Sequence, residues 1–155
     1  MKNSLILGWR EWVSLPDLGI NAIKVKIDSG ARTSALHAYF VEPFEQENIQ
    51  MVRFGMHPIQ GNEKFTVICE TEVHDLRVVT DSGGHREERY VIKTPIVLGE
   101  RKRNIELTLT NRDTMKFRML LGRTAMDNDI VISPAKSYLL GKELSKYHAR
   151  KEMEE

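Results

Sequence analysis

The 155-residue sequence is poor in cysteine, in unbalanced charge and in long apolar runs. Its single cysteine, Cys69, excludes an intrachain disulfide framework and a zinc site built from several cysteines. A catalytic thiol needs a histidine partner and nothing in the local sequence suggests one, so we expect Cys69 to be a small buried apolar residue. The formal net charge of +1 gives no general reason to expect nucleic acid or a membrane surface as a partner.

Long apolar segments are also missing. No stretch approaches the roughly 18 apolar residues of a membrane span. The short run Leu5-Ile6-Leu7 stops at Gly8, well below the h-region of about 7 residues or more in a secretory signal. We therefore expect a cytoplasmic protein with a single domain over residues 1–155, in which the charged segment 142–155 forms a fraying tail.

Short runs with alternating apolar and polar residues dominate the rest of the chain, and this is the pattern of strands with one buried face. The clearest runs are 23–27, 105–109 and 115–121, and further candidates are 49–56, 65–69, 76–80, 89–98 and 130–133. Turn residues separate them at 61–62, 81–84, 98–100 and 111–113. Helical signal is confined to short segments near the C-terminus, 123–128 and 141–150. The pattern predicts an all-β barrel.

Two apolar strands end in unusual ways. Val25-Lys26-Ile27 runs into Asp28-Ser29-Gly30, and much later Met119-Leu120-Leu121 runs into Gly122. Peptide hydrolysis by carboxylates needs two of them around one water, one taking a proton and the other donating one to the carbonyl. Two carboxylates held close together cannot both ionise comfortably, so one stays protonated. Because the chain has one acid in this setting, Asp28, we expect a homodimer with a shared site.

The tripeptide Asp-Ser-Gly alone is more often a surface turn than a site. The chain contains a second copy, Asp81-Ser82-Gly83, between two strand patterns, and we interpret it as a hairpin turn that could serve as a flap. Asp28 is the better catalytic candidate because Leu120-Leu121-Gly122 follows at a distance that leaves room for such a flap. Gly30 permits a sharp turn there, and the Ser29 hydroxyl could hold the loop in place.

The pattern Asp28-Ser29-Gly30-Ala31, a hairpin, then Leu120-Leu121-Gly122 resembles that of retropepsins. More narrowly, segments 8–13, 28–38, 84–89 and 120–126 are similar to a bacterial and archaeal retropepsin-like family formerly labelled as ATP-dependent zinc proteases, and the resemblance runs from about Leu7 to Leu140. It implies a closed acid-protease barrel and aspartic endopeptidase activity, with Asp28 as the catalytic aspartate and Ser29 and Gly30 as its supporting loop. It also implies a link to ATP-grasp glutamate ligases, whose glutamate-rich tails on a small-subunit ribosomal protein the peptidase would trim.

The residues themselves do not support zinc or ATP. None of the five histidines has the His-Glu-x-x-His spacing, and the phosphate-binding pattern Gly-x-x-x-x-Gly-Lys-Ser/Thr is absent. We therefore expect no metal and no cofactor. A metallopeptidase is the least favoured alternative.

Substrate binding is predicted for Ala31, whose small side chain lets the loop approach a peptide, and for four arginines. These are Arg32, Arg86, Arg89 and Arg123, which lie in or beside the segments that would line the cleft. The planar guanidinium suits carboxylates, so as a group they favour an acidic peptide. For any one of them a surface role or a local ion pair is the simpler interpretation.

Two alternatives stay open. A non-catalytic module could use the same barrel to bind acidic tails, because a motif does not prove turnover. A monomeric enzyme would need a second acid from its own chain, for which Asp81, Asp127 and Asp129 are the candidates.

Overall fold

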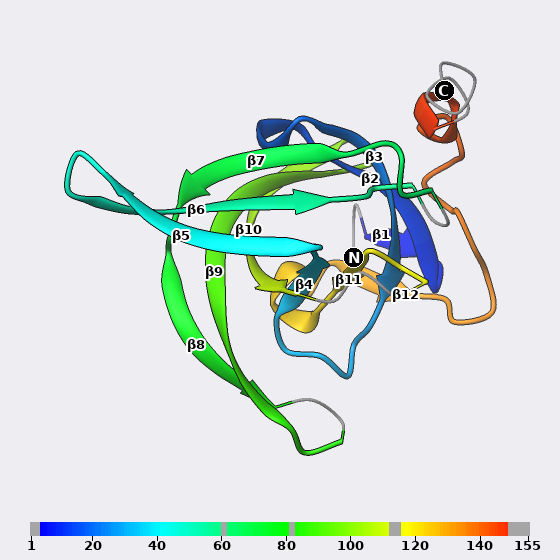
Figure 1. Cartoon of the computed structure of the whole chain (residues 1–155). Coiled ribbons are helices and arrows are strands. Elements are labelled where there is room, and N and C mark those ends of the chain that lie inside the picture. The colour runs from blue at the N-terminus through cyan, green and yellow to red at the C-terminus, as the bar shows by residue number, and fades with distance from the viewer. Residues whose placement is uncertain (1–3, 60–61, 81–82, 112–115, 149–155) are drawn as a thin grey trace.

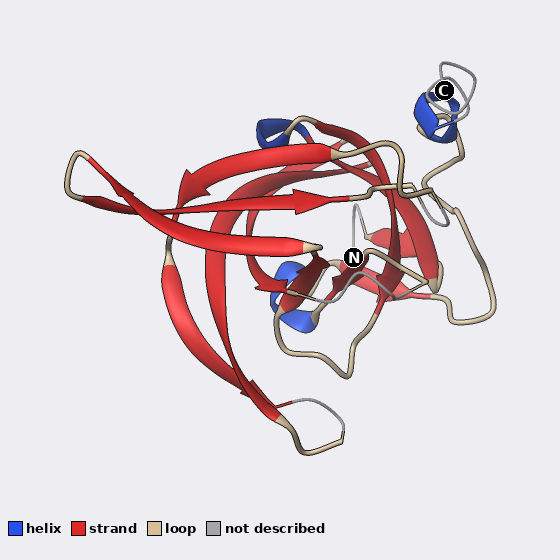
Figure 2. Cartoon of the chain, viewed as in Figure 1, coloured by secondary structure: helices blue, strands red, loops and turns tan. Residues whose placement is uncertain are grey.

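The computed structural model describes residues 4–59, 62–80, 83–111 and 116–148 (Figure 1). Strands dominate these ranges (Figure 2), so the predicted all-β class is confirmed. In chain order the elements are β1 (Leu5–Leu7), β2 (Arg10–Leu15), the 3-10 turn η1 (Pro16–Leu18), β3 (Ile20–Ile27), β4 (Ser34–His37), β5 (Phe40–Gln46), β6 (Ile49–Met56), β7 (Val67–Glu72), β8 (Asp75–Thr80), β9 (Arg86–Leu98), β10 (Arg101–Thr110), β11 (Met119–Leu121), the 3-10 turn η2 (Arg123–Ala125) and β12 (Ile130–Ile132).

The main sheet is a ring-like mixed sheet. Its strand order is β10-β4-β11-β3-β2-β9-β8, and β9 also pairs with β10, which returns the order to its start. The contact between β2 and β9 is narrow, a single pair of Ser14 with Val97, whereas β9 and β10 pair over eight residues from Arg101↔Leu98 to Thr108↔Val91. The predicted barrel therefore takes the form of a ring with one weak seam.

The short strand β11 enters between β3 and β4. It runs parallel to β3, with Met119 opposite Val25 and Leu121 opposite Ile27. It runs antiparallel to β4, with Leu120 opposite Ala35. Segments almost a hundred residues apart in the chain thus become neighbours, and the loops that follow β3 and β11 emerge at the same edge of the sheet.

The core fills the ring. Alternate residues of β3 and β10 point into it, and Ile23, Val25, Leu107 and Leu109 are at most 3% exposed. This matches the alternation in the sequence and removes one apolar face of each strand from water. Cys69 also lies in this core, at 5% exposed, and burial raises the pKa of its thiol to about 11. The prediction that it is a small buried residue is confirmed.

A second sheet, β5-β6-β7, lies beside the ring, and Figure 1 shows its β5–β6 hairpin extending away from the main body. A third, two-stranded sheet pairs β1 with β12 in parallel. Residues 145–148 form one helical turn near the C-terminus, within the segment predicted as helical. No helix in the described ranges has the length and apolar character needed to cross a membrane.

The buried carboxylate of Glu11 fastens the N-terminal strands to the segment after β12. It is 0% exposed and accepts hydrogen bonds from the backbone N–H groups of Gly8, Leu139 and Leu140, at 2.6, 2.9 and 3.0 Å. A buried carboxylate that accepts three N–H donors is well compensated for the loss of water. This polar contact was not predicted from the sequence.

Candidate active site

Asp28 follows directly on β3 and is held in a tight turn. Its backbone N–H donates to the carbonyl of Leu121 at 2.9 Å, and its carbonyl accepts from Ala31 at 3.2 Å. Its carboxylate Oδ1 accepts from the backbone N–H of Gly30 at 3.0 Å. Asp28 is half-buried while Ser29 and Gly30 are exposed. The carboxylate is therefore fixed in orientation by its own turn and remains reachable.

The loop after β11 supports this turn from the other side. The N–H of Gly122 donates to the hydroxyl of Ser34 at 3.0 Å, and that of Arg123 donates to the carbonyl of Ala31 at 2.8 Å. A Cβ atom at Gly122 would lie 2.7 Å from the carbonyl carbon of Thr33, so this approach requires glycine. Ser34 is 0% exposed and was not predicted as a site residue. In the sequence, Ser34 is only a hydroxyl residue before an apolar pair. That is a weak signal of a site residue, because its partner is 88 residues away.

The four predicted arginines have different positions. Arg123 begins η2 and contacts the loop of Asp28, where its Nη1 donates to the carbonyls of Ser29 and Gly30, each at 3.2 Å. Arg32 and Arg86 are exposed. Arg89, on β9, has only 11% of its side chain exposed and pairs with Glu87 at 3.2 Å. The structure thus groups Arg123 with the predicted catalytic residues and places Arg86 and Arg89 on a separate strand.

The other acids considered for a second catalytic carboxylate have arginine partners or lie elsewhere. Asp127 pairs with Arg103 at 2.9 Å, and Asp129 pairs with Arg101. These contacts fasten the segment after η2 to the beginning of β10. Asp81 lies outside the described residues.

The hairpin predicted as a flap is formed by β8 and β9, which pair from Asp75↔Val91 to Thr80↔Arg86. Its tip and the loop that follows β3 both reach the lower part of the view in Figure 1. Residues 81 and 82 of the tip lie outside the described ranges.

Within the ranges that the structure describes, no three side chains of His, Cys, Asp or Glu group together as ligands for a metal ion. The histidines are engaged in separate places. For instance, His74 contacts Glu106 at 3.1 Å, and the Nε2 of His148 lies 2.6 Å from the carbonyl of Ala22. The chemistry that the described site offers is that of the Asp28 carboxylate.

Comparison with known proteins identifies a family, similar sequences and a similar fold. A family model described as "RimB-like: Retropepsin-like aspartic endopeptidase RimB" matches residues 6–143. Proteins named probable alpha-L-glutamate ligase are similar, from Shewanella pealeana (48% identical over 139 residues, 90% of this chain) and from Desulfotalea psychrophila (46% over 141 residues, 91% of this chain). The chain spans only about 30% of the length of each ligase.

A crystal structure has a similar fold. It is that of a protein of unknown function (DUF785) from Legionella pneumophila, with 27% sequence identity and a TM-score of 0.69. The match covers 89% of this chain and 99% of that one. Most of the fold of this chain therefore recurs in a solved structure.

Proposed function

Because this chain belongs to the RimB-like family of retropepsin-like aspartic endopeptidases, we propose that it hydrolyses peptide bonds with a pair of Asp28 carboxylates, one from each copy of a homodimer. The observation that carries the proposal is the setting of Asp28. Its carboxylate is fixed by Gly30, stands where two parallel strands end, and is reachable from solvent. Within the described residues the candidate acids Asp127 and Asp129 are paired with arginines, which supports a second carboxylate from another copy.

In the proposed reaction the two carboxylates hold one water between them. The ionised carboxylate takes a proton from the water, whose oxygen bonds to the carbonyl carbon of the substrate. The protonated carboxylate donates its proton to the carbonyl oxygen. The carbon–nitrogen bond then breaks as the leaving nitrogen takes the proton that the first carboxylate received from the water. A hydroxyl of the tetrahedral intermediate returns a proton to the second carboxylate as the carboxyl product forms. The N–H of Gly30 and the carbonyl contacts of Arg123 keep the Asp28 loop rigid through these steps.

We propose a glutamate-rich peptide as the substrate. Two features support this choice: the similar proteins that are named glutamate ligases contain a segment like this chain, and arginines accompany the loop and β9. An enzyme that adds glutamates and a domain that removes them act on the same acidic tail. The alternative, a module that binds such tails without cleaving them, has the same charge preference but no turnover.

The test is a cleavage assay followed by mass spectrometry. Glutamate-extended peptides and the same peptides without the extension are incubated with wild type, Asp28→Asn and the control Asp17→Asn, whose exposed carboxyl lies in η1. We expect wild type and the control to release glutamate-containing fragments and Asp28→Asn to release none while keeping the same thermal unfolding. Cleavage by Asp28→Asn would overturn the catalytic role. Binding of the extended peptide by wild type without any product would favour the binding module.

A further inference from the structure

One face of the ring points away from the apolar core and leads to Asp28. Strand register places one row of residues across it: Lys26, Leu120, Ala35, Thr108 and Val91. Because side chains alternate along a strand, Lys26 and Asp28 occupy the same face. This row therefore lies next to the predicted catalytic loop.

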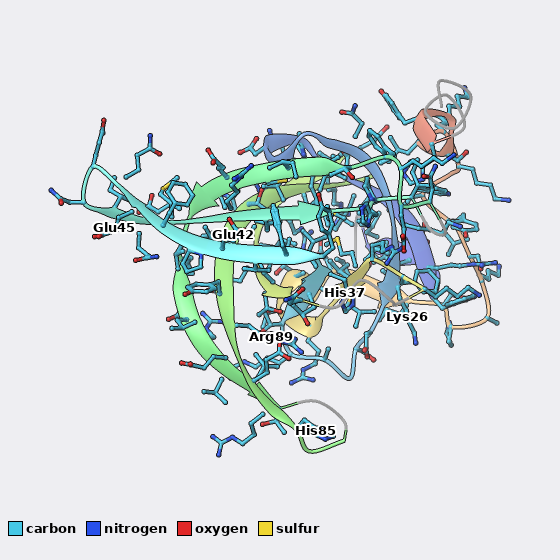
Figure 3. All side chains as sticks on the ribbon, viewed as in Figure 1. Lys26, His37, Glu42, Glu45, His85 and Arg89 are labelled. Carbon is cyan, nitrogen blue, oxygen red and sulfur yellow. The ribbon has the colours of Figure 1, made fainter. Side chains whose placement is uncertain are left out.

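A second row lies on the same face, two residues further from Asp28 along each strand, and its side chains are polar or basic. His37 and Thr110 are register partners on β4 and β10, and the N–H of His37 donates to the carbonyl of Arg118 at 2.8 Å. The Thr110 hydroxyl reaches Glu87 Oε1 at 3.5 Å, and the same oxygen accepts from Arg89. Figure 3 shows His37 and Arg89 near the centre of the view, whereas His85 lies near the hairpin tip.

The basic side chains at this second level, those of His37, Arg118 and Arg89, are largely buried. His37 and Arg118 are 4% and 5% exposed, and the Arg89 side chain is 11% exposed. A guanidinium this buried requires anionic partners. Among the described residues Arg89 has one ion pair, in which Nε meets Glu87 at 3.2 Å, and the Glu87 side chain is itself 39% exposed.

The geometry of a guanidinium then decides what else Arg89 can do. It carries five N–H donors in a planar fork, and one edge of the fork binds a carboxylate with two parallel hydrogen bonds. Glu87 engages the Nε donor, which leaves the edge formed by the two terminal nitrogens for a further acceptor. That edge matches a carboxylate brought by a ligand.

We propose that Arg89 determines specificity by binding the side-chain carboxylate of a glutamate in the substrate, and that Glu87 positions it through Nε. This inference rests on the proposed function and deepens it, because it assigns one of four candidate arginines to a subsite. Exposed Arg32 and Arg86 are not needed for it, and Arg123 serves the loop.

The spacing between the rows also indicates how far from the cleaved bond the bound glutamate lies. Four residues of strand separate the level of Asp28 from the level of Arg89, which is an offset of about 13 Å along the strands. An extended peptide needs about four residues for this offset alone. Because β11, β4 and β10 also lie between β3 and β9 along this row of the sheet, this is the shortest possible reach. Arg89 therefore binds a glutamate remote from the cleaved bond, and the enzyme prefers tails long enough to reach it.

The experiment measures kcat/KM for a series of glutamate-extended peptides, from tails shorter than this reach to tails beyond it. For wild type we expect a rise of about ten- to hundredfold once the tail reaches Arg89, the effect of one charge-assisted, two-pronged contact. Arg89→Gln abolishes the rise. Arg89→Lys, which keeps the charge but loses the fork, restores part of it. Glu87→Gln raises KM for long tails more than it lowers kcat.

The matched control is Arg53→Gln, which removes another arginine that faces a glutamate, Glu70 at 3.9 Å, on the second sheet. It should keep the full rise. An unchanged rise in Arg89→Gln would overturn the subsite.

Binding of the long peptide is measured as well, by calorimetry, for Asp28→Asn and for Asp28→Asn combined with Arg89→Gln. Weaker binding in the combined variant supports the subsite, even where no peptide is cleaved and the catalytic proposal fails. Equal binding in both variants would overturn the subsite, even where cleavage proceeds and the proposed function holds.

Discussion

At Gly122 the chain leaves no room for a side chain. A Cβ atom there would meet the backbone of Thr33 at 2.7 and 2.9 Å and the carbonyl of Ala31 at 3.0 Å. Since these atoms belong to the loop that carries Asp28, Gly122→Ala has to move that loop. We expect a loss of about 1–3 kcal/mol in the free energy of unfolding, measured by urea titration, and a loss of peptidase activity even where the protein is fully folded.

Gly8→Ala is the matched control for this substitution. A Cβ atom at Gly8 would clash with the carbonyl oxygen of Lys136, next to the terminal sheet rather than at the loop. It should lower stability by a similar amount and leave the activity of the folded fraction close to wild type. Equal activity losses in the two variants would show that the loop has no special sensitivity.

Single residues were predictable where their own neighbours in sequence determine their setting. The strand before Asp28, the turn residues after it and the apolar surroundings of Cys69 are all local, and the structure places these residues as that pattern indicates. Ser34 and Glu11 could not be identified, because their partners lie 88 and up to 129 residues away. A polar residue among apolar ones signals burial, but not what it binds.

At the scale of elements, the strand patterns predicted most strands, the short β12 among them, but missed β1 and β2. The runs 23–27 and 105–109 lie inside β3 and β10. In the described part of the run 115–121, the strand covers Met119–Leu121, and two of these residues pair with β4. Neither β4 nor β5 was predicted. Pro95 lies on β9 between the parts that pair with β8 and with β2, and its register partner is Asn104 on β10.

Besides its pairing with β9, strand β8 is linked to β10 through the side chain of Glu106. Glu106 accepts from Arg77 at 2.7 Å and contacts His74 at 3.1 Å. The hydrogen bond from Arg77 holds the pKa of Glu106 below its ordinary value of 4.5. A lowered pKa in the folded state stabilises the protein above the ordinary value and loses this effect as the pH falls through the lowered one.

Glu106→Gln should therefore lower the free energy of unfolding by about 1 kcal/mol or less at neutral pH. The difference from wild type should shrink below about pH 4.5 and vanish in more acidic solution. Urea titrations over this range measure it. Glu70→Gln is the control, because Glu70 and Arg53 are half exposed and 3.9 Å apart, and it should show no pH-dependent difference. A Glu106→Gln difference that persists in acid would assign the effect to packing rather than to charge.

For the whole molecule, the number of turn signals and the absence of long helical patterns predicted a barrel in one domain. They did not predict which strands become neighbours. Insertion of β11 between β3 and β4, the contact of β2 with β9 and the parallel pair of β1 and β12 all join distant segments. The resemblance to retropepsins implied this kind of barrel, and the fold of the solved relative agrees with it.

The proposed homodimer makes a prediction about mixtures, because each site then needs Asp28 from both copies. When wild type is mixed with Asp28→Asn and the subunits are allowed to exchange, only wild-type pairs keep two carboxylates. An equal mixture should retain roughly a quarter of the activity of the same total amount of wild type, since copies of a twofold dimer pair at random. Sites complete within one chain would retain about half in the same test. Sedimentation velocity on the same samples checks that dimers form. A linear fall of activity with the fraction of Asp28→Asn would overturn the shared site, and would direct the search for a second acid to the chain's own carboxylates.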